Sequence, residues 1–203
     1  MTLFTNAAKN LMLEALDEAS ITGADFASLH TAYPGTTGTG EVTGGAPAYA
    51  RKGIVWAAAA AGSKALTGTA VFDVPTGTSV GWVGFWDAVT VGTFLFATPA
   101  GGGALKTFAV DDIATDVFDS PAHGLTAGQA VVVWGTALPT GVVQGTTYYA
   151  RDILADSFKL AATSGGVAID ITVVGTGHAQ LQVIESFGAQ GTYTLSAATI
   201  AVA

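Results

Sequence analysis

The sequence contains one short pattern that is typical of a nucleophilic serine. Gly77, Ser79 and Gly81 form G-x-S-x-G, which in hydrolases places a serine at a sharp turn between a strand and a helix. Here a proline turn precedes the serine and an aromatic, strand-like run follows it, so the context of the motif is wrong. Asp119 and His123 complete a catalytic triad only in name, because they lie in a different part of the chain. We therefore predict that the chain is not an enzyme.

A group of aspartates is the next candidate for chemistry. Calcium is bound by several carboxylate and carbonyl oxygens, but this group lacks the regular spacing and the final glutamate of an EF-hand loop. It also does not single out two acids that would flank a sugar in a glycosidase. We expect a solvated edge, with calcium binding as the alternative. The four candidate ligands are Asp111, Asp112, Asp116 and Asp119.

The remaining polar motifs predict no metal, cofactor or phosphate site. His30, His123 and His178 are never spaced for a local zinc chelate, and the absence of cysteine removes thiolate ligands and disulfides. We expect His30 and His123 to form hydrogen bonds within the fold. The glycine-rich segment 35–45 matches no phosphate-binding loop, so we interpret it as a flexible connection.

Aromatic side chains could form a platform on which a sugar stacks. The four tryptophans occur in runs that are apolar on both faces, so core packing is the better interpretation for them. Tyr148 and Tyr149 are the candidate glycan contacts, and strand alternation allows at most one of them to be exposed. The tryptophans are Trp56, Trp82, Trp86 and Trp134.

Composition restricts the class of protein further. Half of the 203 residues are hydrophobic, only 11% are charged, and the net charge is −8 with seven lysines and arginines. Nucleic-acid binding is disfavoured because it needs clustered basic residues. No run reaches the roughly 20 apolar residues of a membrane span, and the opening residues do not resemble a signal peptide. We expect synthesis in a cytoplasm and a surface that is covered by partner subunits.

Patterning predicts a mainly β protein with one short helix at the N-terminus. We expect strands at 26–33 and 48–60 and a strand buried on both faces at 79–86, separated by Pro/Gly turns as in an antiparallel β-sandwich. The helix is predicted over 5–20, docked through one apolar stripe. The stripe consists of Ala8, Leu11, Met12, Ala15, Leu16 and Ala19.

The composition and the spacing of the predicted strands change between residues 105 and 183. Seven of the eleven aspartates fall there, among short strands at regular intervals. Residues 184–203 again have the composition and strand pattern of the first part of the chain. We predict that a base domain of residues 1–104 plus 184–203 is interrupted by a β-rich insert of residues 105–183, whose ends lie close together and which faces outward.

Four segments outside the predicted insert are distinctive: NAAKNLMLEAL, SLHTAYPGTTGTGEVTGGAPAYARKGIVWAAA, TAVFDVPTGTSVGWVGFWDAVTVGTFL and SFGAQGTYTLSAATIAV. Together they resemble a family of small phage tail fibre or virion structural proteins. In shorter members of this family the third block runs almost directly into the fourth, as the predicted insertion requires. The insert resembles a module of phage tail proteins through DVFDSPAHGLTAGQAVVVWG, LPTGVVQGTTYYAR and DSFKLAATSGG. The resemblance implies a virion protein, assembled in the host cytoplasm, without a catalytic motif.

Three functions follow as hypotheses. The first is a surface-exposed tail, fibre-associated or minor tail protein that contacts the host, with a host-surface glycan as a candidate ligand. The second is a capsid decoration protein that stabilises the coat lattice, and the third is a polysaccharide-cleaving enzyme. The first two predict a homo-oligomer that associates with tail or major capsid proteins, because few edge lysines or prolines block strand pairing.

Overall fold

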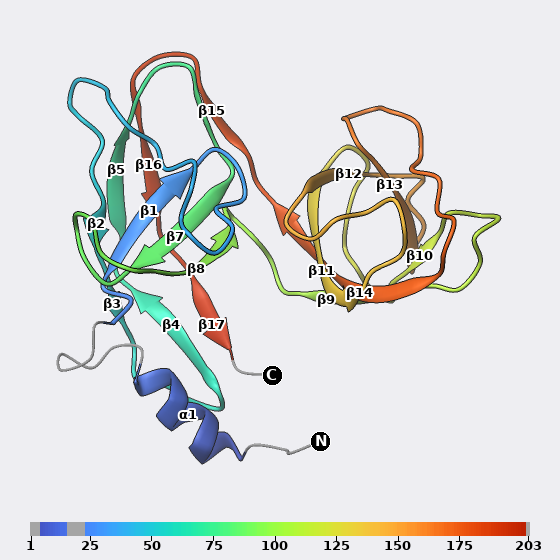
Figure 1. The fold of residues 1–203 in the computed structure, drawn as a ribbon, viewed down its shortest axis with the longest axis horizontal. Coiled ribbons are helices and arrows are strands. Elements are labelled where there is room, and N and C mark those ends of the chain that lie inside the picture. The colour runs from blue at the N-terminus through green and yellow to red at the C-terminus, as the bar shows by residue number, and fades with distance from the viewer. Residues whose placement is uncertain (1–4, 16–22, 202–203) are drawn as a thin grey trace. The chain divides into compact units, whose positions relative to one another are not determined.

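The computed structural model describes residues 5–15 and 23–201, and it divides the chain into two compact units. The first unit comprises Met1–Thr98 and Glu185–Ala203, and the second comprises Pro99–Ile184. Both are built from antiparallel strands, with one short helix among the described residues (Figure 1). The mainly β, antiparallel fold class predicted from the sequence is confirmed. No helix in this part of the chain is long and apolar enough to cross a membrane.

The first unit contains four small sheets (Figure 1). Within these sheets, β1 pairs antiparallel with β2 and β7, β15 with β6, β16 with β5, and β4 with β17 and β3. The four-stranded sheet has the order β2-β1-β7-β8, and the three-stranded sheet has the order β17-β4-β3. Two pairs, β16-β5 and β15-β6, complete the unit. The bounds are β1 Phe26–His30, β2 Lys52–Gly53, β3 Val55–Trp56, β4 Ser63–Thr67, β5 Ala70–Val74, β6 Thr78–Val80, β7 Trp82–Trp86, β8 Phe94–Pro99, β15 Glu185–Phe187, β16 Gly191–Leu195 and β17 Thr199–Ala201.

Strand β7 lies in the interior of the four-stranded sheet. It pairs with β1 on one side and β8 on the other, and all five of its residues are buried. Trp82 and Phe85 are each only 1% exposed. This confirms that the run from 79 to 86 contains a strand buried on both faces, as its uninterrupted apolar sequence predicted.

The last strands of the chain complete the first unit. β15, β16 and β17 pair with β6, β5 and β4, so residues after 184 join strands that precede residue 81. Thr192, for example, lies opposite Asp73 in the β16-β5 ladder. The first unit is therefore discontinuous in sequence.

Two strand predictions need correction. The strand at 26–33 ends at His30, because the chain turns into a loop before Pro34. The predicted strand over 48–60 is reduced to the two-residue strands β2 and β3. Between them, the Ile54 amide donates to the Asp25 carbonyl oxygen, which continues the register of the β1-β2 ladder by one residue beyond Phe26 and Gly53.

Helix α1, Asn6–Glu14, docks through a different face from the predicted one. The Thr5 hydroxyl caps it by accepting from the Ala8 amide at 3.2 Å. Leu13 is buried at 1% exposure, whereas Leu11 and Met12, which belong to the predicted apolar stripe, are 74% and 48% exposed. Leu16 and Ala19, the last members of that stripe, lie outside the described residues.

Polar contacts explain this orientation of the helix. The Glu14 carboxylate accepts from the Ala59 amide and pairs with the Lys64 ammonium at 2.7 Å, and Asn10 Oδ1 accepts from the Gly62 amide at 2.7 Å. Lys64 is 1% exposed, so its charge needs an anion nearby. This ion pair and the Ala59 amide lower the pKa of Glu14.

The second unit is a closed six-stranded barrel with the order β10-β13-β12-β11-β14-β9 (Figure 1). All six neighbouring pairs are antiparallel, so no strand of the barrel has a free edge. Its core contains Phe108, Phe118 and Phe158, with Phe118 stacked on Phe158 at 5.4 Å between ring centroids. The bounds are β9 Lys106–Val110, β10 Phe118–Asp119, β11 Ala130–Ala137, β12 Thr147–Arg151, β13 Ser157–Ala161 and β14 Gly175–Gln182.

The two chain ends of the second unit lie side by side. The Val183 amide donates to the Ala100 carbonyl oxygen at 2.8 Å, and a side chain at Gly101 would collide with Val183. The chain therefore enters and leaves this unit at one place, which is the geometry expected of an insert. That the insert can be removed without unfolding the first unit stays a prediction.

Candidate functional site

Ser79 does not occupy a nucleophile elbow. It is an exposed residue of strand β6, and after Gly81 the chain continues directly into strand β7. Its hydroxyl lies 2.9 Å from the Ser186 hydroxyl on the neighbouring strand β15. The serine is thus part of a two-stranded ladder and not of the strand-turn-helix that hydrolases use.

His123 uses both ring nitrogens for backbone hydrogen bonds inside the second unit. Nδ1 accepts from the Leu125 amide at 3.0 Å, so the neutral ring carries its proton on Nε2, which donates to the Leu154 carbonyl oxygen at 2.9 Å. The ring also lies edge-on to Phe158. This confirms the predicted hydrogen bonding of His123 within the fold, in which both ring nitrogens are bonded to the backbone.

The four candidate calcium ligands do not gather around one point. Asp112 Oδ1 accepts from the Ala114 amide at 2.9 Å, Asp116 Oδ1 accepts from the Ile171 amide at 2.8 Å, and Asp119 lies in the β10 ladder opposite Ser157. Asp111 is exposed beside Asp112. Within residues 5–15 and 23–201, no three His, Cys, Asp or Glu side chains are placed to share a metal ion.

The tyrosine pair is divided between the two faces of strand β12. Tyr148 points into the barrel core at 5% exposure, and its hydroxyl accepts from the Val143 amide at 2.8 Å. Tyr149 is half-buried on the outer face. The tryptophans of the first unit, Trp56, Trp82 and Trp86, are all buried, whereas Trp134 of β11 is partly exposed and lies outside the barrel core, so the core-packing prediction is wrong for Trp134. The predicted aromatic residues therefore do not form a continuous platform.

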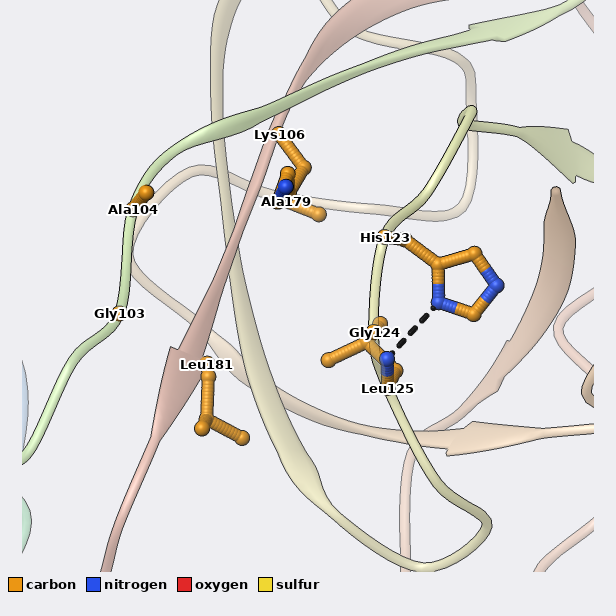
Figure 2. Close-up of a pocket in the computed structure, with 8 residues that line it drawn as sticks. All are labelled: Gly103, Ala104, Lys106, His123, Gly124, Leu125, Ala179 and Leu181. Atoms are coloured by element: carbon orange, nitrogen blue, oxygen red, sulfur yellow. Dashed lines mark hydrogen bonds between the residues drawn. The ribbon is translucent and has the colours of Figure 1, made fainter. Parts of the chain in front are cut away.

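A small hollow in the second unit is lined by strands β9 and β14 and by two loop segments. Its volume is about 110 Å³, well below the roughly 300–1,000 Å³ of ordinary ligand pockets. In Figure 2 the His123 ring extends to the side away from Gly103, Ala104 and Leu181. Lys106 is the one charged residue in the lining. A single lysine beside apolar residues does not define a ligand site. The lining residues are Gly103, Ala104, Lys106, His123, Gly124, Leu125, Ala179 and Leu181.

A buried hydrogen-bond network surrounds His30 in the first unit. Nδ1 lies 2.8 Å from the Thr39 carbonyl oxygen, which can only accept, so this nitrogen carries the proton. Nε2 then accepts from the Ser28 hydroxyl at 2.7 Å, and the Ser28 oxygen accepts from Trp86 Nε1 at 2.8 Å. Burial lowers the pKa of His30. A methyl group at Gly84 would lie 2.5 Å from His30 Nε2, so only glycine fits beside the network.

Arg51 joins two loops near this network, a role that the sequence alone did not indicate. Its guanidinium pairs with Glu41 at 2.7 Å and donates to the carbonyl oxygens of Ala88 and Val91. It also lies 3.4 Å above the centre of the Trp86 ring. Neither Arg51 nor Glu41 belongs to a charged cluster in the sequence, so only the fold brings them together.

The glycine-rich segment is tied to the same place. The amides of Gly38 and Thr39 both donate to the Pro34 carbonyl oxygen, and a methyl group at Gly38 would lie 2.3 Å from the Trp86 ring. Gly38 has a φ of 74°, a conformation that favours glycine. At this position, glycine is needed for close packing and for a turn, in addition to any flexibility that it gives.

These contacts define a β-rich protein whose conspicuous polar groups hold loops in place. Comparison with known proteins agrees with this class. Residues 4–127, well over half of the chain, match the model of the family described as podophage GP4 fiber I protein gp80. The chain therefore belongs to this family of phage fibre proteins, as the resemblance of its sequence blocks implied. No curated protein and no solved structure matches the chain significantly.

Proposed function

We propose that this chain is a non-enzymatic structural subunit on the surface of a phage particle, associated with the tail or its fibres, and that its inserted barrel contacts the host. The observation that carries the proposal is the family match over residues 4–127. A fibre is part of the virus particle, so other virion proteins are the natural partners of the first unit.

The hydrogen bonds of the candidate catalytic residues support a structural role. Ser79 bonds to a serine on the next strand, His123 bonds only to backbone, and His30 is fully buried in a neutral network. A nucleophile and its base need to be within hydrogen-bond reach of each other and of a substrate. Ser79, His123 and His30 form their hydrogen bonds with other groups, and none of these bonds joins a serine nucleophile to a histidine base that faces a substrate site.

The geometry of the second unit supports its display toward the host. Its two ends are adjacent, because the Val183 amide donates to the Ala100 carbonyl oxygen. Closure removes the free edges that would otherwise attract other strands. A closed barrel whose two ends are adjacent can be carried within the chain without changing the strand pairing of the first unit.

We further propose that the chain works as a homo-oligomer. Only 11% of its residues are charged, and the sheets of the first unit end in the strands β2, β8, β3 and β17. Neutral surface and open strand edges favour contacts between subunits. Sedimentation of the purified chain measures this directly, with a species larger than one chain as the expected result and a monomer that binds no virion protein as the contradicting one.

The location of the chain on the particle tests the main proposal. We expect gold-labelled antibodies against the second unit to decorate the tail or its fibres on intact particles and to block adsorption to host cells. Label over the whole capsid with normal adsorption would favour the decoration alternative. Degradation of purified host polysaccharide by the isolated chain would support the enzymatic alternative instead.

A further inference from the structure

The second unit has one end that is remote from its chain connections. Strands β9 and β11 finish at this end and β14 begins there, with Val110 opposite Gly175 and Ala137 opposite Thr176. The chain enters and leaves at the other end, where Ala100 bonds to Val183. We call residues 111–116, 139–146 and 169–174, which lie at the remote end, the distal loops.

The distal loops are bonded to one another. Asp116 Oδ1 accepts from the Ile171 amide at 2.8 Å, which ties the first loop to the third. Thr140 Oγ1 accepts from the amides of Thr172 and Val173 at 2.9 and 2.8 Å, which ties the second loop to the third. These bonds connect the three loops to one another.

This surface exposes aliphatic side chains. Val143 is 63% exposed, Val173 55%, Val174 51% and Ile113 48%. Isolated exposed apolar residues are ordinary, but here four lie on three loops that are bonded to one another, and we call these four side chains the patch. Burying such side chains against a partner releases water and stabilises the complex.

The charges around the patch indicate what the partner looks like. Asp111, Asp112 and Asp170 are exposed beside it, and the distal loops contain no lysine, arginine or histidine. They also contain no aromatic residue on which a sugar ring could stack. A partner with phosphate groups, or the same face of a second copy, would be repelled by the carboxylates.

We propose that the distal loops bind a host-surface protein that presents basic residues around an aliphatic patch. This inference rests on the proposed function, which makes the chain a host-contacting subunit, and it specifies the partner. It places recognition on the valines and aspartates of the distal loops, and not on Tyr148 and Tyr149.

The test measures binding of the labelled full-length chain to cells of the phage's host. A double variant, Val143→Ser with Val173→Ser, removes two exposed aliphatic side chains from the patch. A triple variant, Asp111→Asn with Asp112→Asn and Asp170→Asn, removes the charges. The control, Val55→Ser with Leu154→Ser, removes aliphatic side chains that are 64% and 68% exposed outside the distal loops. Circular dichroism and thermal melting verify that each variant is folded.

We expect both distal-loop variants to bind about tenfold more weakly or worse, while the control binds like the unmodified chain. Binding should be lost when the cells are treated with protease and should weaken with salt, but it should survive periodate oxidation of glycans. Loss on periodate but not on protease would show a glycan partner and overturn the inference. Equal binding by all variants would overturn the inference alone, whereas no binding by the unmodified chain would overturn the proposed host contact as well.

Discussion

His30 makes the stability of the first unit depend on pH. The folded protein holds the ring neutral, because Nδ1 donates to a carbonyl oxygen and Nε2 accepts from the Ser28 hydroxyl. Burial lowers the pKa of His30, with Glu41 and Arg51 as the charged groups that act on it in opposite directions. The unfolded chain takes up a proton near the ordinary value of 6.5, so protonation favours unfolding.

We therefore expect the free energy of unfolding contributed by His30 to be complete above about pH 6.5 and to fall as the pH decreases toward the lowered pKa. His30→Gln should cost about 1–3 kcal/mol at pH 7.5, because it leaves buried partners unsatisfied. The variant should also lose less stability than the original between pH 7.5 and pH 5. Urea unfolding at both pH values measures this, with the exposed His178→Gln as control. An unchanged pH dependence in His30→Gln would contradict the role assigned to His30.

Gly38 provides a second test at the residue scale. An alanine there would adopt a φ of 74° and place its methyl group 2.3 Å from the Trp86 ring. Gly38→Ala should destabilise the first unit by about 2–4 kcal/mol, through backbone strain and overpacking together. Gly35→Ala is the matched control, because Gly35 has a φ of 64° with open space around it, and it should cost about 1 kcal/mol. Thermal melting compares the two, and equal losses would show that contact with Trp86 is unimportant.

Among the secondary-structure elements, helix α1 depends on one apolar residue and two polar anchors. Leu13→Ala should cost about 2–5 kcal/mol of docking free energy, because Leu13 is 1% exposed. Leu11→Ala should change stability by less than about 0.5 kcal/mol, because Leu11 is 74% exposed. Hydrogen exchange at the amides of α1 measures docking locally. Faster exchange in Leu11→Ala than in Leu13→Ala would show that the helix docks through the face predicted from the sequence, which contains Leu11.

The contrast between Leu11 and Leu13 shows what sequence patterning can and cannot predict. Helical spacing correctly predicted a helix near the N-terminus, although α1 ends at Glu14 and does not reach residue 20, and the apolar run ending at Trp86 correctly predicted a buried strand. The docking face was wrong because it is decided by Lys64, about 50 residues away, whose buried charge needs Glu14. Periodicity within a helix carries no information about such a partner.

The candidate site residues illustrate the same limit. The sequence correctly predicted a strand and not a helix after Ser79, and it correctly assigned His123 to backbone hydrogen bonds, since both depend on local context. It did not predict the contact of Arg51 with Trp86, which joins residues 35 positions apart, or the closure of the barrel by β9 and β14. Both result from pairings between distant segments, and no local pattern specifies them.

At the scale of the whole molecule, the two units should fold separately. Deleting residues 105–183 leaves Gly101, Gly102 and Gly103 as a ready-made flexible connection between β8 and β15. We expect the shortened chain to remain soluble, to give a β-type circular dichroism spectrum and to melt cooperatively, because the ends of the deleted segment are adjacent. The isolated segment 99–184 should also fold. An insoluble product in the first experiment would show that the first unit needs the insert.

The hydrogen bond between Ala100 and Val183 also bears on how such a protein can diversify. Two crossovers in the gene, one on each side of the segment encoding residues 99–184, would exchange the whole barrel in a single event. Any replacement module whose termini lie equally close would leave the pairing of β15, β16 and β17 with β6, β5 and β4 undisturbed. Under the proposed function, such an exchange would give a new adsorption specificity while the strand pairing of the first unit stays unchanged.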